Sequence, residues 1–345
     1  MAGRRVTLAP ASGRDAAPSL SLGLLLAMQA AMQPRRRFLV GPKGRSWSFH
    51  EADAAASHVG WSLRQLGVAA GEPVLLMTPN SDRAAIALAG AMRAGCKPVM
   101  APADLPFADG FALAASLRPV AIIGETSETG GATMAAAARL AAASPSVRRL
   151  LGFGDHLPNG ATDLGERIER ARVAIDMPRL EEATETASIR FASAGAEPAE
   201  WPMAEMLAAC VSLATSAGLR SGDRIVSPLP PDDPCGLVCG LFLGLFVGAE
   251  LALLDAPDGA AIMAALDGAG GRHLVWPRRR ADLIAPLLAG APLLRSLIRR
   301  GRDIDDDQRA SQLAERTVDV IARDNGRIDV RVSPGHLPGE DPTPH

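Results

Sequence analysis

The chain contains the same arrangement of glycines and prolines around short apolar runs twice. In each copy, two glycines four residues apart precede a buried-strand pattern, a proline, a helical pattern, another glycine and a second apolar run. The first copy spans 66–100 and the second 218–254. Glycine commonly ends a helix, proline ends a strand, and parallel strands need a crossover of this length. The sequence therefore predicts a three-layer α/β protein with two similar parallel β-α-β units, centred on residues 72–101 and 223–254.

The segments around the two copies carry weaker patterns. Apolar periodicity predicts helices over 20–32, 47–64, 132–143 and 303–323, and strands over 119–124, 150–153 and 273–276. The ends are polar and rich in proline and glycine. We therefore expect a disordered N-terminus over 1–17, one domain over 18–330 and a disordered tail over 331–345.

Composition restricts the partners and the compartment. A net charge of −2 argues against nucleic acid as the main partner. The apolar run in 20–32 is interrupted by Gln29, and no segment is long and apolar enough to span a bilayer. Four cysteines do not form a disulfide framework in a chain this long, and Cys235 and Cys239 share an apolar helix face. The sequence predicts buried thiols and a cytoplasmic protein.

The stretch 191–203 has small residues between an expected strand and an expected helix. It reads Phe-Ala-Ser-Ala-Gly-Ala-Glu-Pro-Ala-Glu-Trp-Pro-Met. Backbone N–H groups of such a loop can surround a phosphate. Phosphate transfer also needs a cation, yet no Lys, Arg or His occurs between Phe191 and Leu219. The stretch has the shape expected of a phosphate site and lacks the charge.

Several further motifs follow one another in a fixed order. They are Arg45–Asp53, Leu63–Glu72, Met77–Ser81, Ala94–Val99, Pro102–Pro106, Gly218–Ile225 and Gly236–Ala249. Together they resemble the adenylate-forming (AMP-binding) superfamily, which includes acyl-CoA synthetases, luciferases and the adenylation domains of peptide synthetases. The resemblance implies the large N-terminal domain of an acyl-CoA synthetase. Members of this family join a carboxylate to AMP with ATP and magnesium and then pass the acyl group to a thiol.

The phosphate loop of that family reads approximately Thr-Ser-Gly-Thr-Thr-Gly-x-Pro-Lys-Gly. Laid over it with one gap, this chain keeps Ser193 and Pro198. Ala199 stands at the lysine position and Glu200 at the following glycine. A carboxylate facing a triphosphate is repulsive. The resemblance therefore implies Ser193 as a cofactor-binding remnant and no catalytic or metal-binding residue.

Other family elements also differ or are not found. Residues 230–234, Pro-Pro-Asp-Asp-Pro, replace the aromatic-histidine segment that shapes the acyl pocket. After Gly301 we find no Gly-Tyr-Gly-x-Thr-Glu run, no ribose-binding aspartate and no catalytic lysine of a small C-terminal domain. We therefore expect a truncated, degenerate domain of this family, with the small C-terminal domain absent.

Three functions remain open at this point. The first is a catalytically degenerate, non-enzymatic binding or regulatory partner of another protein in an acyl-activation or acyl-carrier pathway, with no cofactor. The second is a carboxylic acid-activating acyl-CoA or acyl-carrier ligase that another chain completes and that uses ATP and magnesium. The third is an acyl- or nucleotide-binding module without turnover. A hydrolase triad at Ser193 is not supported, and His273 is expected to be structural.

Overall fold

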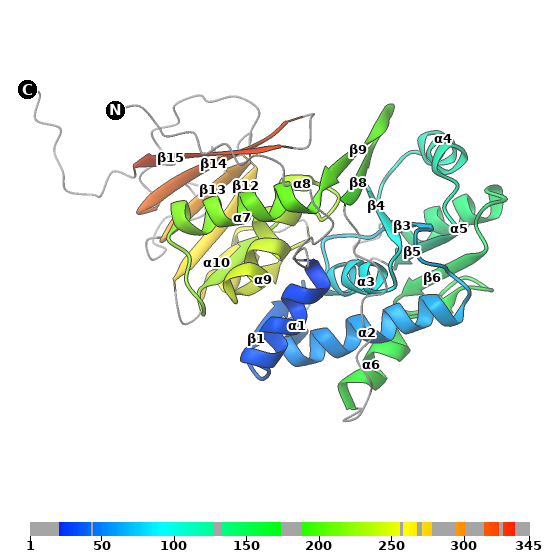
Figure 1. Ribbon diagram of the computed structural model, residues 1–345, viewed down its shortest axis with the longest axis horizontal. Coiled ribbons are helices and arrows are strands. Elements are labelled where there is room, and N and C mark those ends of the chain that lie inside the picture. Colours follow the sequence, from blue (N-terminus) through cyan, green and yellow to red (C-terminus); the bar gives the residue numbers. More distant parts are fainter. Residues whose placement is uncertain are drawn as a thin grey trace, which may run out of the picture.

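The computed structural model describes residues 21–42, 44–126, 133–173, 188–255, 258–267, 271–277, 294–300, 314–323 and 327–334. Two sheets of mostly parallel strands stand beside each other, with helices between and around them (Figure 1). The largest apolar core draws side chains from both sheets and from the helices between them. The two sheets therefore form one packed body.

The first sheet, on the right of Figure 1, has seven strands within the described residues. In spatial order they are β7 (Thr162–Asp163), β6 (Arg149–Phe153), β5 (Ala121–Glu125), β3 (Pro73–Met77), β4 (Lys97–Ala101), β8 (Ser188–Ser193) and β9 (Ala196–Pro202). All neighbouring strands are parallel except β8 and β9, which are antiparallel.

The second sheet has eight strands within the described residues. In spatial order they are β15 (Ile328–Pro334), β14 (Arg316–Ala322), β13 (Ser296–Arg300), β12 (Arg272–Pro277), β10 (Arg224–Ser227), β11 (Glu250–Leu253), β1 (Arg37–Val40) and β2 (Ser46–Ser48). The pairs β14–β15 and β1–β2 are antiparallel and the others are parallel.

The described helices are α1 (Leu22–Met32), α2 (Phe49–Gln65), α3 (Asp82–Arg93), α4 (Phe107–Leu117), α5 (Thr133–Ala143), α6 (Gly165–Val173), α7 (Met203–Ala217), α8 (Pro234–Leu237), a π-helical turn (Val238–Phe242), α9 (Leu243–Val247) and α10 (Gly259–Leu266). A capping box of Ser48 and Glu51 starts α2. None of the helices in the described ranges is long and apolar enough to cross a membrane.

The two predicted β-α-β units are confirmed. Strands β3 and β4 flank α3 and pair in parallel, and β10 and β11 do the same around α8, the π turn and α9. The six glycines of the pattern all have positive φ, between +65° and +93°; they are Gly67, Gly71, Gly95, Gly218, Gly222 and Gly248. Because side chains are strained in this region, glycine is needed at each of these turns.

The two units are joined at the carboxyl ends of their strands. Asn80 follows β3, and its Nδ2 donates hydrogen bonds to the carbonyl oxygens of Ser227 and Leu254, each at 2.9 Å. Ser227 ends β10 and Leu254 follows β11. Asn80 is buried, so both amide protons are satisfied across the interface rather than by water. This side chain connects the first sheet to the second.

One predicted helix is wrong over the part that the structure describes. Residues 316–322, within the helix expected over 303–323, form β14. The segment contains four β-branched residues, Thr317, Val318, Val320 and Ile321, which fit a buried strand better than a helix. Strand β14 is paired on both sides, by β13 and β15. The preceding 301–313 lie outside the described residues.

The predicted boundary of the tail is also wrong. Strand β15 continues to Pro334, so residues 331–334 pair with β14 instead of starting a disordered tail at 331. The rest of that tail, 335–345, and the predicted disordered N-terminus, 1–17, lie outside the described residues. The helix predicted over 20–32 is confirmed as α1, with the Ser21 hydroxyl as its N-cap.

Candidate functional site

Most of the stretch 191–203 forms a β-hairpin rather than the open loop expected from the sequence. Strand β8 ends at Ser193, Ala194 and Gly195 make the turn, and β9 begins at Ala196. Gly195 has a φ of +70°, as tight hairpin turns require. The predicted loop is thus reduced to a two-residue turn.

Aromatic packing holds the hairpin against the core. Phe191 and Trp201 lie on the two strands with ring centroids 6.1 Å apart in an edge-to-face arrangement, and both are buried. Ala199 lies opposite Phe191 and packs against the same core. Pro198 is tolerated because β9 is the edge strand of the sheet. The residue at the family's lysine position is therefore fixed on the core side of β9.

Glu200 is paired within the hairpin. It lies opposite Arg190, and its carboxylate accepts hydrogen bonds from the Ser188 hydroxyl at 2.5 Å and from Arg190 at 3.3 Å. The Ser188 hydroxyl, helped by Arg190 and by Lys97 at the start of β4, holds the pKa of Glu200 below its ordinary value, against the opposing effect of partial burial. The sequence placed Glu200 against a triphosphate, whereas in the structure Arg190 and Ser188 engage its charge.

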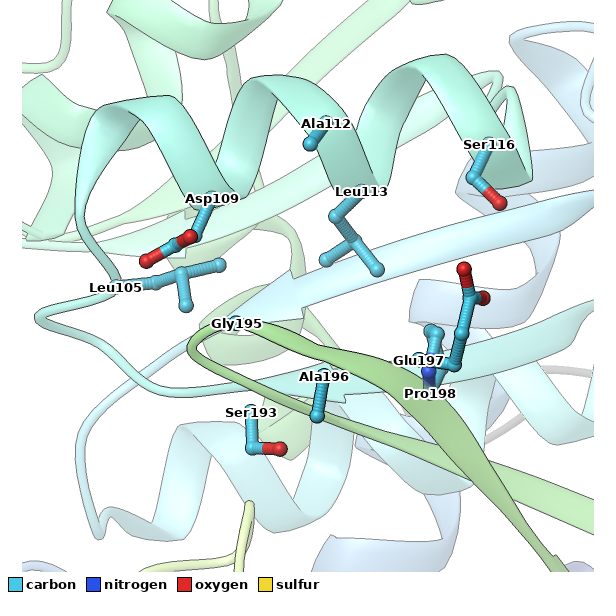
Figure 2. Close-up of a pocket in the computed structure, with 10 residues that line it drawn as sticks. All are labelled: Leu105, Asp109, Ala112, Leu113, Ser116, Ser193, Gly195, Ala196, Glu197 and Pro198. Carbon is cyan, nitrogen blue, oxygen red and sulfur yellow. The ribbon is translucent and has the colours of Figure 1, made fainter.

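A cleft of about 350 Å³ separates the hairpin from α4 (Figure 2). It is lined by Leu105, Asp109, Ala112, Leu113 and Ser116 on one side and by Ser193, Gly195, Ala196, Glu197 and Pro198 on the other. Figure 2 shows the Glu197 carboxylate and the Ser116 hydroxyl facing each other at one end, with Asp109 at the other. The cleft includes Ser193, the site residue expected from the sequence.

The cleft is acidic. Its ionisable lining residues are Asp109 and Glu197, and neither forms an ion pair or side-chain hydrogen bond with another described residue. A triphosphate requires cations or metal-bound charge at this position. The described residues contain no group of three or more His, Cys, Asp or Glu arranged to hold a metal ion. The described lining of this cleft therefore does not fit ATP with magnesium.

The segment 230–234 forms a helix start instead of the family's aromatic-histidine segment. The Asp233 carboxylate accepts hydrogen bonds from the backbone N–H groups of Cys235 and Gly236, at 2.9 and 3.4 Å, and forms an ion pair with Arg300 at 2.9 Å. Burial raises the pKa of Asp233, although Arg300 opposes the shift. Burial also raises the pKa of Asp232 to about 6. Carboxyl groups thus occupy the region that shapes the acyl pocket in the family.

The second sheet contains a Ser-His-Asp chain that the sequence did not predict. His273 Nδ1 lies 2.7 Å from Ser296 Oγ, and His273 Nε2 lies 3.1 Å from Asp223 Oδ2. Both His273 and Ser296 have an exposed fraction of 0%, so no substrate can reach the hydroxyl. Burial lowers the pKa of His273. These hydrogen bonds connect the starts of β10, β12 and β13, and the full burial of His273 supports the structural role predicted for it.

The predicted buried thiols are also confirmed. All four cysteines are buried, and none of them forms a disulfide bond. Burial raises the pKa of Cys96 and of Cys235 to about 12, so neither is a reactive thiolate at neutral pH.

These features define the protein class. Two mostly parallel sheets joined at the carboxyl ends of their strands, with the β8–β9 hairpin paired beside β4, form the N-terminal domain of acyl-CoA synthetase-like enzymes. The chain belongs to the AMP-binding enzyme family, whose profile matches residues 26–275. No curated protein sequence matches it.

Solved structures support this fold. The N-terminal domain of FACL13 from Mycobacterium tuberculosis matches with a TM-score of 0.72 and 19% identity, over 88% of this chain and 76% of that one. VinN in complex with L-aspartate matches with a TM-score of 0.71 and 18% identity, over 93% and 80%. A benzoate CoA ligase from Burkholderia xenovorans LB400 matches with a TM-score of 0.70 and 19% identity, over 88% of this chain and 61% of the ligase. At these identities the likeness establishes the fold.

Ser193, the candidate predicted from the sequence, lines the cleft, whereas the two charged residues of the cleft were not predicted. Asp109 comes from α4 and Glu197 from β9, and only the folded chain places both along one cleft. Asp109 lies in none of the motifs quoted above, and Glu197 lies in the stretch 191–203 without a predicted role. Asn80 lies in the family motif Met77–Ser81, so the sequence marked the residue. Its hydrogen-bond acceptors in the second unit could not be predicted from the sequence.

Proposed function

We propose that this protein is a non-catalytic member of the AMP-binding family that acts as a binding or regulatory partner of another protein in an acyl-activation or acyl-carrier pathway. The main support is the hairpin: the residue aligned with the family's lysine is Ala199, on the core side of an edge strand, and the described lining of the adjoining cleft contains two carboxylates without an ion pair and no Lys, Arg or His. Adenylation displaces pyrophosphate, whose charge must be stabilised by preorganised cations and N–H donors.

The position of Ala199 bears on whether activity can be restored. A lysine at position 199 would be attached at a partly buried position opposite Phe191, where a charged group is poorly solvated. The Asp109 and Glu197 carboxylates would remain in the cleft. Loss of one charge-stabilising donor typically costs about 10²–10³ in rate, and losses in one site do not simply multiply. We therefore expect turnover near background both in the wild type and in the Ala199→Lys/Glu200→Gly variant.

The test is carboxylate-dependent pyrophosphate exchange over a panel of acids, with an active acyl-CoA ligase as the positive control. Titration calorimetry with ATP–magnesium measures binding separately from turnover. We expect no exchange above background, and ATP–magnesium binding that strengthens in Asp109→Asn/Glu197→Gln because the repulsion is removed. Robust exchange by the wild type alone with any acid would refute the proposal.

A further inference from the structure

A second cleft, of about 440 Å³, lies at the C-terminal end of α7. Its polar lining includes Thr215, Arg220, Arg295, Glu315 and Arg316. Helix α7 starts after β9 and leads away from the hairpin along the second sheet (Figure 1). Its 15 residues correspond to about 22 Å at 1.5 Å per residue, so this cleft is far from the hairpin. A small ligand bound in this cleft would therefore not reach the hairpin.

Two of the three guanidinium groups are held in place by the protein. Arg295 Nη1 donates to both carboxylate oxygens of Asp223, at 3.1 and 3.0 Å. Arg316 Nη1 lies 3.5 and 3.4 Å from the carbonyl oxygens of Thr215 and Ser216, at the end of α7. Each keeps its Nη2 and Nε protons free of other described partners. Groups positioned in this way lose little conformational entropy when they bind a ligand.

The third guanidinium group, that of Arg220, has no partner among the described residues. The Arg220 side chain is exposed and forms no hydrogen bond or ion pair with any described residue. Asp223, which lies behind the cleft, already accepts hydrogen bonds from the backbone N–H groups of Arg220 and Gly271 and contacts His273 and Arg295. Its negative charge is therefore engaged, and the cleft retains an excess of positive charge.

Glu315 distinguishes this cleft from a simple basic patch. It lines the cleft among the arginines without an ion pair or side-chain hydrogen bond to a described residue. A carboxylate weakens the binding of a bare anion, but it can accept hydrogen bonds from hydroxyl groups. The cleft also falls within the range of volumes typical of small-molecule sites and exceeds the size of a phosphate ion. These features favour a ligand with a phosphate at one end and hydroxyl groups at the other.

We propose that this cleft binds a small hydroxylated phosphomonoester, such as a sugar phosphate. Arg220, Arg295 and Arg316 bind the phosphate through their planar N–H forks, which match its oxygens, and Glu315 accepts hydrogen bonds from the hydroxyl groups. Inorganic phosphate satisfies only the arginine side of the site. Ribose 5-phosphate satisfies both.

The test is titration calorimetry of the full chain with inorganic phosphate and with ribose 5-phosphate, with ionic strength kept constant by sodium chloride. We expect ribose 5-phosphate to bind more tightly than phosphate. Arg220→Gln should weaken both by about tenfold, since a hydrogen bond to a charged group is lost from an exposed position. Arg170→Gln, which removes an exposed arginine of α6, is the matched control and should change neither.

Glu315→Gln tests the hydroxyl contact. Removing its charge should strengthen the binding of inorganic phosphate while reducing the preference for ribose 5-phosphate. Circular dichroism checks that each variant is folded. A further variant, Arg316→Gln, removes an arginine that contacts the end of α7. If it unfolds, Arg220→Gln still tests the site, because Arg220 is exposed. Two results would overturn the proposal: no heat beyond that of the chloride control, or equal affinities in the wild type and in Arg220→Gln. A preference for ribose 5-phosphate that is unchanged in Glu315→Gln would refute the role of the carboxylate.

Discussion

The two β-α-β units have the same glycine framework but different crossovers. In the first, α3 is a continuous helix, and the Ser81 hydroxyl caps it by accepting from Ala84 N–H. In the second, Asp233 and Pro234 start α8, a π-helical turn follows, and α9 completes the crossover. A π turn accommodates one extra residue in a helix, which accounts for one of the two residues by which the Gly222–Gly248 spacing exceeds the Gly71–Gly95 spacing. The framework thus fixes the fold, while the crossovers and strand ends are free to differ.

The polar groups of the two units also differ in what they contact. In the first unit, Asn80 and Arg93 make buried hydrogen bonds to other elements. In the second, the carboxyl groups of Asp232 and Asp233 lie at the helix start, where burial raises their pKa values. The buried polar groups of the first unit therefore bind other elements of the fold. Those of the second unit include two carboxyl groups that water solvates poorly. Four predictions test this contrast, beginning with the largest expected effect and ending with the smallest.

The largest effect is expected for Arg93→Met. Arg93 forms a buried ion pair with Asp53 and also donates to Ser57 Oγ at 2.6 Å and to Gly23 O at 3.1 Å. Its loss leaves a buried carboxylate and should lower the free energy of unfolding by about 4 kcal/mol.

The stability loss of Arg93→Met is compared with that of Arg299→Met in the second sheet. Arg299 binds Asp319 through two hydrogen bonds of 2.9 and 3.0 Å, but its Nη1 is buried without a partner in the described part of the chain. That unpaired group already costs stability, so this variant should lose less. Urea unfolding of both variants is the measurement, and an equal or larger loss for Arg299→Met would contradict the contrast.

Asn80→Ala removes the bridge between the units. Two carbonyl oxygens, of Ser227 and Leu254, lose a donor in a buried interface, and we expect a loss of about 2 kcal/mol. Asn80→Asp, which has a similar shape but no amide protons, should be more damaging because it brings a carboxylate against the two carbonyls. Thermal and urea denaturation measure both. Equal stability of Asn80→Asp and the wild type would show that the amide protons do not hold the interface.

The third prediction concerns pH. Burial raises the pKa of Glu125, at the end of β5, from 4.5 to about 7, although the Ser81 hydroxyl 2.5 Å away and Arg83 oppose the shift. The folded state then holds this proton more tightly than the unfolded chain does. Its stabilising contribution is complete below pH 4.5 and declines as pH rises to about 7, by at most about 1.4 kcal/mol per pH unit.

Glu125→Gln should remove that decline, so its stability relative to the wild type should improve between pH 5 and pH 8 in urea titrations. For Asp232, whose pKa rises from 3.8 to about 6, Asp232→Asn should act over a lower pH range. Parallel pH profiles of wild type and Glu125→Gln would contradict this assignment.

The smallest effect is expected at the crossover glycines. A methyl group at Gly90 of α3 would lie 2.5 Å from Val59 Cβ and 2.8 Å from the Ala56 carbonyl oxygen of α2. Overpacking should outweigh the helix propensity gained, so Gly90→Ala should destabilise the fold by about 1 kcal/mol. At Gly244 of α9 the nearest atoms would be 3.7 Å away, and Gly244→Ala should be neutral or slightly stabilising. The same sign for both substitutions in thermal denaturation would show that the two crossovers are packed alike.

The glycine framework explains how much of the fold could be predicted. Positive φ at positions such as Gly71 and Gly222 favours glycine, and glycine can be recognised directly in the sequence. Spacing between these glycines then fixed the order strand, helix, strand, and the family resemblance extended it to the large N-terminal domain. The strand–helix–strand order is confirmed by the parallel pairs β3–β4 and β10–β11. The family assignment is confirmed by the family match.

The elements that were not predicted depend on long-range pairing. Strand β9 contains Pro198 and Pro202, which disfavour a strand, and it forms because it needs only one partner at the edge of the sheet. Strand β14 lies in a charged region, and pairing with β13 and β15 overrides the helical pattern. The cleft beside Ser193 depends on how α4 packs beside the hairpin. Only β14 had a local signal, its β-branched residues, whereas the contacts of β9 and of the cleft leave none in the sequence.

The Asn80 bridge has a consequence for evolution. Cohesion of the two units depends on an amide in the loop after β3, whereas the family's phosphate loop corresponds to a hairpin on an edge strand. Selection for a folded domain alone would keep Asn80 and leave Ala199 and Glu200 free to drift. A lineage could therefore lose the chemistry of this family and retain its shape, because the two properties are inherited through different residues.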